Sequence, residues 1–329
     1  LALDGVEIQP LGEALAADIH WGRDLFGVLE SAGQDPVDRP LAALNTAAAD
    51  QGFAIRFTGR AARPIHFRYI HRDAASDVLM RHLVKVEAGA EATIFEDGPG
   101  GARFNKAMEV DVADGASLNH VRVQGKDHER LAATHLFARL GAESAFKSFT
   151  LTVNGRLTRN EVIIEFTGDD ASGHVGGACI GEGDFVHDDT VFVTHDAVNC
   201  ESRQVFKKVL KAGAKGVFQG KILVREGAQK TDGYQISQGL LLDDDADFSA
   251  KPELEIYADD VACSHGSTCG AVDETALFYL RSRGVPEAAA KDMMVLAFVD
   301  EAIQEIEDDG VADSVRERIG AWLARRSGS

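Results

Sequence analysis

The sequence is short of cysteine and lacks the common motifs for nucleotides and closed metal sites. Its 329 residues include four cysteines, and no two of them have the CxxC spacing of a structural zinc site or a ferredoxin-type cluster. No GxxxxGK[ST] segment occurs either, so the chain has no P-loop with which to hydrolyse ATP. So few cysteines are typical of a cytoplasmic protein, in which the thiols stay reduced.

Basic charge and long apolar runs are also scarce. The 34 Lys and Arg residues are outnumbered by 53 Asp and Glu residues, for a net charge of −19, and such a surface repels nucleic acid and anionic lipid. No apolar run approaches the roughly 20 residues that a membrane helix needs. The opening segment, LALDGVEIQP, does not have the basic and apolar regions of a signal peptide. We therefore expect neither a nucleic-acid partner nor a membrane partner.

What the chain has in abundance is short strand patterns. From about residue 46 to 270, runs such as Gly52–Phe57 and Val191–Thr194 recur every ten to fifteen residues, with Gly and Asp turns between them. Evenly spaced short strands are typical of a sandwich, a barrel, a propeller or a β-helix. The region is long for one sandwich and shows no blade-length repeat, so we favour a β-helix. Glu201–Ala212 stays ambiguous, because Val205 and Val209 have helix spacing in a run that also suits a strand.

Helical patterns lie at both ends of this strand-rich region. Leu11–Ala17 and Asp24–Leu29 predict short helices, which Pro36 and Pro40 interrupt. The chain begins without Met, and we expect part of the N-terminal region to be missing. The predicted organisation is a short N-terminal helical region over 1–45, a β-domain over 46–270 and a C-terminal α-helical domain over 271–329.

The C-terminal helices have clear boundaries. Asp273 is a good N-cap for a first helix that ends at Gly284, and Pro286 starts a second one. Gly310 is expected to end the second helix, and Asp313–Arg325 to form the third. About sixty residues cannot bury much surface alone, so part of their apolar side is expected to meet the β-domain or a partner.

Two side chains near the end of the β-domain suit a soft or borderline metal. In a strand, Cys263 and His265 point to the same side, and a thiolate beside an imidazole can bind iron that carries sulfide. Two ligands do not complete a site, so the others must come from elsewhere or from another chain. The alternative is a packed cysteine beside a histidine with ordinary hydrogen bonds. Cys269 either joins the pair across a turn or fills space as a small apolar residue.

A second, looser group consists of His187, His195 and Cys200, for which turn residues and a core thiol are the alternative. Two rival functions are compatible with the fold. A β-helix enzyme that acts on polysaccharide would need clustered carboxylates and usually a secretion signal, and no such signal is visible. A purely structural β-helix needs neither.

The stretch from about 190 to 300 resembles a known family. The segments AQKTD, LLL, KPELEIYADDV, CSHG and LFYLRSRG follow one another in order, as in the SufB/SufD family of iron–sulfur cluster assembly proteins. Upstream, THDAVNCESRQVFK and PLAALN are similar to segments of the same family. The resemblance implies a right-handed parallel β-helix followed by a C-terminal α-helical domain.

The resemblance also implies partners. SufB and SufD pair through their β-helices, and each binds one SufC, an ATPase of the ABC type, through its C-terminal helices. The chain would then be a non-catalytic scaffold, with ATP hydrolysis in SufC, and pairing between two copies of this chain stays open. The residues expected to dock SufC are Leu277, Phe278, Leu280, Arg281, Arg283, Met293 and Leu296.

In the same family the nascent cluster is thought to form between the two β-helices. The resemblance assigns His265, with Cys263 beside it, to this chain's share of a transient iron–sulfur cluster. SufB supplies a cysteine from the segment that matches Tyr234–Leu241, where this chain has none, and this favours the SufD branch of the family over the SufB branch. The secondary candidates are Cys200, His195 and Cys269.

Overall fold

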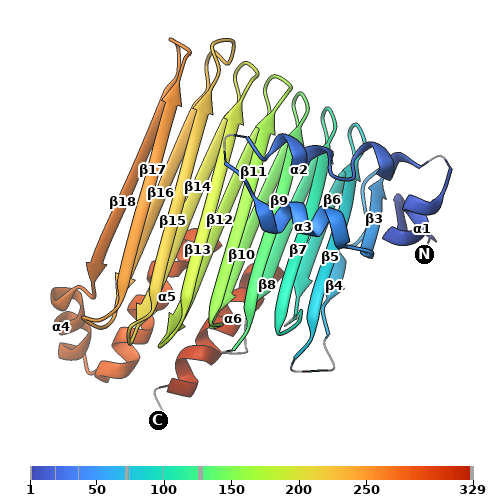
Figure 1. Cartoon of the computed structure of the whole chain (residues 1–329). Coiled ribbons are helices and arrows are strands. Elements are labelled where there is room, and N and C mark those ends of the chain that lie inside the picture. Colours follow the sequence, from blue (N-terminus) through green and yellow to red (C-terminus); the bar gives the residue numbers. More distant parts are fainter. Residues whose placement is uncertain are drawn as a thin grey trace.

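The protein folds as a long β-helix with helices packed on both of its faces (Figure 1). The structure, a computed structural model, describes residues 2–18, 20–35, 37–70, 73, 75–98, 100–124 and 129–326. The helices are α1 (Leu11–Ala16), the 3-10 helix η1 (Trp21–Asp24), α2 (Val28–Ala32), α3 (Pro40–Ala48), α4 (Glu274–Ser282), α5 (Glu287–Ile303) and α6 (Asp309–Arg326). The strands are β1 (Ala2–Leu3), β2 (Val6–Pro10), β3 (Gln51–Phe57), β4 (Ile65–Arg68), β5 (Asp77–Val86), β6 (Glu91–Asp97), β7 (Arg103–Val112), β8 (Ser117–Gln124), β9 (Leu131–Leu140), β10 (Ala145–Val153), β11 (Leu157–Phe166), β12 (Ser172–Glu182), β13 (Val186–His195), β14 (Glu201–Lys211), β15 (Lys215–Val224), β16 (Asp232–Leu241), β17 (Asp247–Ile256) and β18 (Ala262–Ala271).

The strands alternate between two sheets, so that each coil of the β-helix contributes one strand to each sheet. The ten-stranded sheet has the order β1-β2-β3-β5-β7-β9-β11-β13-β15-β17, and the eight-stranded sheet runs from β18 through the even-numbered strands to β4. Neighbouring strands beyond β3 pair in parallel, and one coil takes between 26 residues (Asp77 to Arg103) and 32 residues (Lys215 to Asp247). This is the predicted parallel β-helix.

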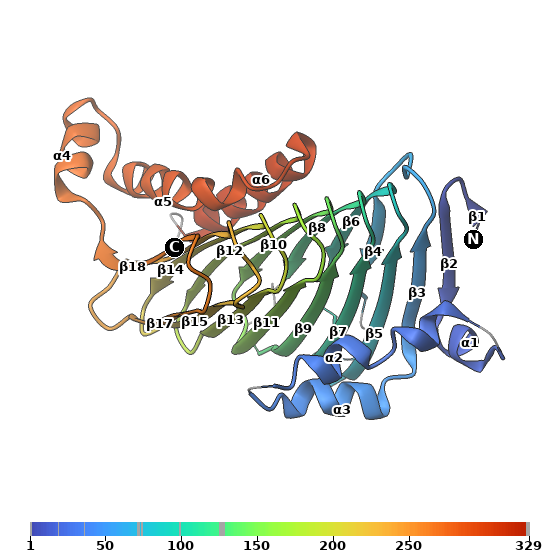
Figure 2. The same ribbon diagram turned by 90° about the horizontal axis from the view of Figure 1, so that it is seen from above.

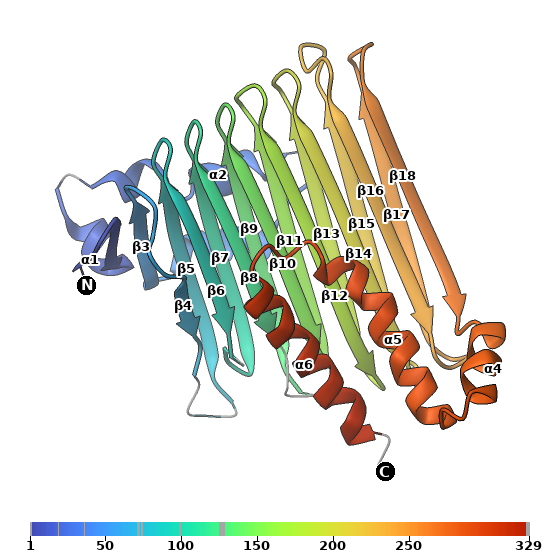
Figure 3. The same ribbon diagram turned by 180° about the vertical axis from the view of Figure 1, so that it is seen from behind.

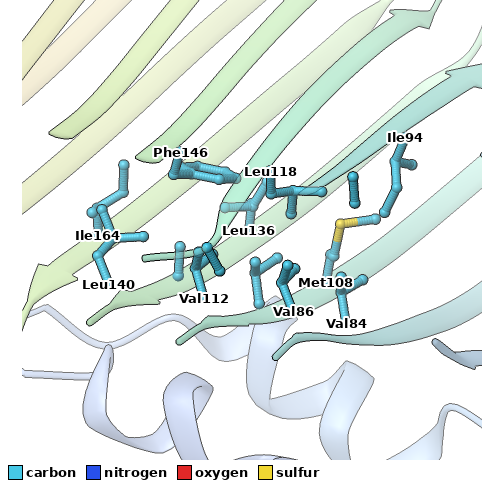
Figure 4. Packing of buried hydrophobic residues seen from close by; sticks show 14 of the residues in the cluster. Val84, Val86, Ile94, Met108, Val112, Leu118, Leu136, Leu140, Phe146 and Ile164 are labelled. Atoms are coloured by element: carbon cyan, nitrogen blue, oxygen red, sulfur yellow. The ribbon is translucent and has the colours of Figure 1, made fainter. Parts of the chain in front are cut away.

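Inward-facing side chains stack in rows, because each strand lies in register with its neighbour. One row of the ten-stranded sheet runs through Val84, Val110, Ala138, Ile164, Val193 and Ile222. All of them are at most 4% exposed. Figure 4 shows such residues meeting Ile94, Leu118 and Phe146 of the other sheet. Burying one side chain of this kind contributes about 1.5–3 kcal/mol, so these rows hold the two sheets together.

Ionisable side chains also lie inside the β-helix. Glu96 is fully buried and is hydrogen-bonded to Lys106 and His120. Further along, the Lys208 ammonium lies 2.6 Å from the buried Asp189 carboxylate. Burial acts to raise the pKa of Glu96, but Lys106 and His120 outweigh it and hold that pKa well below its usual value. The Glu96 carboxylate is therefore charged in the interior. Removing the Lys106 ammonium would lower the free energy of unfolding by about 3–5 kcal/mol.

The ambiguous segment Glu201–Ala212 is strand β14 over most of its length. Its helix-like spacing arises because both faces of this strand are buried. Phe206 packs inside the β-helix, whereas Val205 and Val209 pack with the C-terminal helices on the outer face. Tertiary packing therefore decides in favour of the strand.

The N-terminal helices cover the outer face of the ten-stranded sheet (Figure 2). The Glu109 carboxylate accepts hydrogen bonds from the backbone N–H groups of Gly27 and Leu29, at 2.8 and 3.0 Å, and Arg81 pairs with it. A negative charge at a helix N-terminus is favourable, so this contact places α2. The helix predicted over Asp24–Leu29 is instead divided into η1 and α2, because Gly27 takes a φ of 74° between them.

Two residues that were expected to break helices lie inside them. Pro40 is the first residue of α3, where its fixed φ suits the helix and no N–H is needed. Gly310 is the second residue of α6, because the Asp308 carboxylate accepts a hydrogen bond from the N–H of Val311 at 2.9 Å and so caps this helix. The second C-terminal helix ends earlier, at Ile303.

Helices α5 and α6 form a hairpin across the outer face of the eight-stranded sheet (Figure 3). One apolar cluster joins Phe149, Leu151, Ile180, Val205 and Val209 of the sheet to Val295, Val299, Ile303, Val315, Ile319 and Trp322 of the hairpin. Trp322 Nε1 also donates a hydrogen bond to Asn154 Oδ1 at 3.2 Å. Part of the apolar side of the C-terminal helices therefore meets the β-helix. In the described ranges, no helix has the length and apolar character needed to span a membrane.

Candidate functional site

The β-helix ends in an open coil made of β17 and β18. Within the described ranges each of these strands is the last of its sheet and pairs on one side only. The N–H of Ala262 donates to the carbonyl of Thr231. Because N–H directions alternate along a strand, those of Cys263, His265 and Ser267 point to the open edge. An unpaired edge of this kind is a template for another strand.

Cys263 and His265 lie on the inner face of β18. Cys263 is opposite Gly233 and His265 is opposite Gln235, and both of these partners are buried inside the β-helix. The two side chains therefore share a face, as their spacing predicts. They reach solvent because β18 is the last strand of the described sheet.

A row of buried glutamines leads to His265 from inside the β-helix. Gln235 Nε2 donates a hydrogen bond to Gln204 Oε1 at 2.6 Å, and both side chains are fully buried. Gly220 of the opposite sheet leaves room for this row, since a Cβ there would lie 2.5 Å from Gln235 Cδ. We call Gln204 and Gln235 the glutamine ladder. Gln235 of the ladder lies opposite His265 in the register of β16 and β18.

The inner face of β18 also carries Ser267 and Cys269. The hydroxyls of Ser237 and Ser267 lie 2.8 Å apart, which fixes the register of the last strand. Cys269 is exposed and belongs to the same strand as Cys263 and His265. Because this strand is continuous, Cys269 lies about 13 Å along the chain from His265. The turn that could have brought it to the pair is not present within β18.

Both thiols of this face are protonated at neutral pH when the chain is alone. Burial raises the pKa of Cys263 above its usual value, and it does the same for Cys269. The thiolate is the metal-binding form, so a metal ion would have to displace the proton. His265 is exposed and is the side-chain type that binds metals most often. Within the described ranges, no three His, Cys, Asp or Glu side chains lie close enough to hold a metal ion.

His195 and Cys200 are buried in an earlier coil. His195 Nε2 lies 2.9 Å from the Ser202 hydroxyl, and its ring stacks on Phe166 with centroids 4.4 Å apart. Burial lowers the pKa of His195 to about 4. Cys200 Sγ lies 3.4 Å from the carbonyl oxygen of Gly168. The coil of β15 and β16 separates both residues from β18, so the structure does not bring them to Cys263 and His265.

The apolar residues expected at the SufC-docking surface differ in exposure. Phe278 and Met293 are 73% and 51% exposed, and Tyr279, which follows Phe278 and was not among the expected residues, is 56% exposed. Leu277 is 4% exposed and therefore faces the protein rather than a partner. We call Phe278, Tyr279 and Met293 the exposed apolar patch.

The other expected docking residues lie on the same two helices, α4 and α5, or at the C-cap of α4. Arg281 pairs with Glu287 at 3.3 Å, and the guanidinium of Arg283 lies 5.1 Å from the centre of the Tyr279 ring. Leu280 is partly buried. Leu296 is partly buried too and packs against the cluster that holds the hairpin to the sheet.

Sequence reasoning missed the glutamine ladder, although a signal for it exists. Gln204, Gln235 and His265 occupy the same position in successive coils, 31 and then 30 residues apart. Comparing the chain with itself at the length of one coil would have placed the three side chains in one row. Such a comparison requires the coil length, which varies along this chain.

Comparison with known proteins identifies the family. The family model for the SufBD core domain of SUF system FeS cluster assembly matches residues 69–298. The chain is 30% identical over 282 residues to the iron–sulfur cluster assembly protein SufD of Escherichia coli, covering 82% of this chain and 66% of that protein. It is 28% identical over 257 residues to SufD of Bacillus subtilis, covering 75% of this chain and 58% of that protein. The chain thus spans between 58% and 66% of the length of these two relatives. It belongs to the SufB/SufD family of the SUF iron–sulfur cluster assembly system.

Proposed function

We propose that this chain is a scaffold subunit of the SUF assembly complex and acts together with SufB and the ATPase SufC. Its contribution would be the open last coil, where a nascent iron–sulfur cluster forms between β18 and SufB. The observation that carries this proposal is the placement of Cys263 and His265 side by side on the inner face of an edge strand. The relatives named as SufD support it.

The open edge gives a physical reason for a shared site. A strand of SufB that paired with β18 would satisfy the N–H groups of Cys263 and His265 and extend the sheet. The same pairing would cover the inner face of β18 and remove water from it. Charges and metal bonds are stronger in such a dry site, so pairing and cluster formation would support each other.

The two side chains would contribute in a fixed order. His265 is exposed and needs no thiol deprotonation, so it would be the first donor to iron. Cys263 would follow, because the charge of a bound iron ion favours the thiolate and offsets the effect of burial on the pKa of this thiol. SufB would supply the remaining ligands, and the cluster would be bound only transiently.

SufC would dock on the exposed apolar patch. The patch lies on α4, which follows β18, and on the first half of α5. Asp273 caps α4 through hydrogen bonds from the N–H groups of Thr275 and Ala276 at 2.8 and 3.2 Å. Only Val272 separates this cap from the last residue of β18. Movement of a docked SufC would therefore be transmitted to the strand that carries Cys263 and His265.

We propose further that the chain is cytoplasmic and non-catalytic, with ATP hydrolysis in SufC. The same open edge would pair two copies of the chain when SufB is missing. The proposed domain boundaries are residues 1–45 for the N-terminal helical region, 46–270 for the β-helix and 271–329 for the C-terminal helical domain.

Complementation with His265→Ala tests the proposal. In cells that depend on this chain for cluster assembly, the variant should fail to restore iron–sulfur enzyme activity while still co-purifying with SufB and SufC. Ser264→Ala is the matched control, because Ser264 is next to His265 but faces the opposite side of β18. Normal assembly with His265→Ala in an intact complex would refute the role of this histidine.

A further inference from the structure

A cavity lies on the outer face of the ten-stranded sheet, beside the N-terminal helices and away from β18. Its volume is about 260 Å³, and it opens between α2, the segment that leads to α3, and strands β9, β11, β13, β15 and β17. Ile163, Phe192 and Leu223 are among the residues that line it. These side chains stand on three neighbouring strands and form an apolar floor.

Arg39 lines this cavity and is only 2% exposed. Its Nη1 donates hydrogen bonds to the carbonyl oxygens of Gly33 and Val37, the latter at 2.8 Å. Its guanidinium carbon lies 5.0 Å from the centre of the Phe192 ring, as in a cation–π pair. The two contacts hold the guanidinium plane in one orientation against the floor of the cavity.

The other edge of the same guanidinium is unused. Nε and Nη2 of Arg39 are buried and have no hydrogen-bond partner among the residues that the structure describes. These two N–H groups form the fork with which arginine binds a carboxylate through two parallel hydrogen bonds. Buried donors without a partner are rare and costly. An acceptor at this edge would therefore stabilise the folded protein.

The remaining charges around the cavity limit what can bind. Lys221 already pairs with Glu255, and Arg225 lies 3.5 Å from Asp196. Asp35 and Glu165 also line the cavity, and their carboxylates would repel a second negative charge on the ligand. A ligand with one negative charge and an apolar body meets these conditions, whereas a dianion does not.

We propose that this cavity binds a small monocarboxylate, whose carboxylate is held by Nε and Nη2 of Arg39 and whose apolar body lies on Ile163, Phe192 and Leu223. The site is independent of the cluster role proposed for β18. The bound carboxylate would accept hydrogen bonds from the two unpaired N–H groups of Arg39, and the apolar body of the ligand would cover the floor beside them.

The binding of hexanoate to the whole purified chain tests this proposal. Isothermal titration should show saturable binding of hexanoate, and weaker binding of the dianion succinate and of neutral hexanamide. Arg39→Lys keeps the charge but loses the fork, so it should weaken hexanoate binding about tenfold or more. Arg60→Met is the matched control and should leave binding unchanged, because Arg60 is exposed and pairs with Glu91 at 3.2 Å.

Three results would overturn the proposal. They are the absence of saturable hexanoate binding to the wild-type chain, equal binding by Arg39→Lys, and equal binding of hexanamide, which would indicate an apolar hollow without carboxylate recognition. Phe192→Leu provides a second variant that leaves the guanidinium itself in place. It should also weaken binding, since it removes the ring on which Arg39 rests, and unchanged binding would contradict the geometry.

Discussion

Three buried histidines make the stability of this protein sensitive to acid. Burial lowers the pKa of His82 and His187 to about 3 and that of His195 to about 4, whereas an unfolded histidine titrates near about 6.5. The folded state therefore holds these side chains neutral while the unfolded state takes up protons. Their contribution to stability is fully present above about pH 6.5 and is lost as pH falls towards the folded pKa values. Each group contributes a slope of up to about 1.4 kcal/mol per pH unit.

The variant His195→Phe isolates one of these groups. Phenylalanine can keep the stacking on Phe166 but cannot take up a proton, so the free energy of unfolding should fall less steeply with acid. The expected difference is up to about 1.4 kcal/mol per pH unit between pH 6 and pH 5, measured by urea unfolding at each pH. An unchanged slope in His195→Phe would mean that this histidine titrates alike in both states.

The glutamine ladder depends on a missing side chain at Gly220. A Cβ there would lie 2.5 Å from Gln235 Cδ, so Gly220→Ala should displace Gln235 and lower the free energy of unfolding by about 1–3 kcal/mol. Gly227→Ala is the matched control, since a Cβ at Gly227 would meet nothing within 4 Å. Urea unfolding of both variants checks this. Equal stability of the two would show that the ladder can move without cost.

At the scale of elements, helix boundaries could be predicted better than some strands. Asp273, Gly284 and Pro286 act through contacts within a few residues, and the structure confirms helices beside all three. Strand β12 was not predicted, because its run SGHVGGACIGE lacks large β-forming side chains. Its inward glycines make room for aromatic rings, since a Cβ at Gly177 would lie 2.8 Å from the Phe206 ring. That requirement comes from another coil and is invisible in the local sequence.

Phe278 and Leu277 adjoin each other in α4 but should respond to mutation in different ways. Phe278→Asp places a charge in the exposed apolar patch, so it should abolish co-purification with SufC and leave the unfolding transition unchanged. Leu277→Ala creates a cavity at a buried position and should lower the free energy of unfolding by about 2–5 kcal/mol. Co-purification with SufC and urea unfolding separate the two effects. If SufC still bound the Phe278→Asp chain, the dock would have to lie elsewhere.

At the scale of the whole molecule, the open coil matters more than any single side chain. The spacing of Cys263 and His265 predicts their common face, but only the pairing of strands many residues apart shows that this face lies at an edge and adjoins the ladder. Periodicity along one strand carries no information on which strand comes last. The sequence alone could therefore not predict that Cys263 and His265 lie on an inner face that is open to solvent.

Ser267→Pro tests whether SufB uses this edge. Proline removes the N–H that points to the open side and is tolerated in edge strands when that side faces solvent. The variant should keep its β-helix, seen by circular dichroism, and lose co-purification with SufB. Ser267→Ala is the control for the lost contact with the Ser237 hydroxyl and should still bind SufB. Retained SufB binding by the proline variant would place the interface on another surface.

The most direct test of the account is to ask whether His265 touches the cluster. Only this chain would be labelled with ¹⁵N-histidine, and it would be assembled with unlabelled SufB and SufC under anaerobic conditions. Electron–nuclear double resonance of the reduced, paramagnetic cluster should then show ¹⁵N coupling that disappears in His265→Ala. A cluster that forms in the same yield without ¹⁵N coupling from this chain would contradict the account.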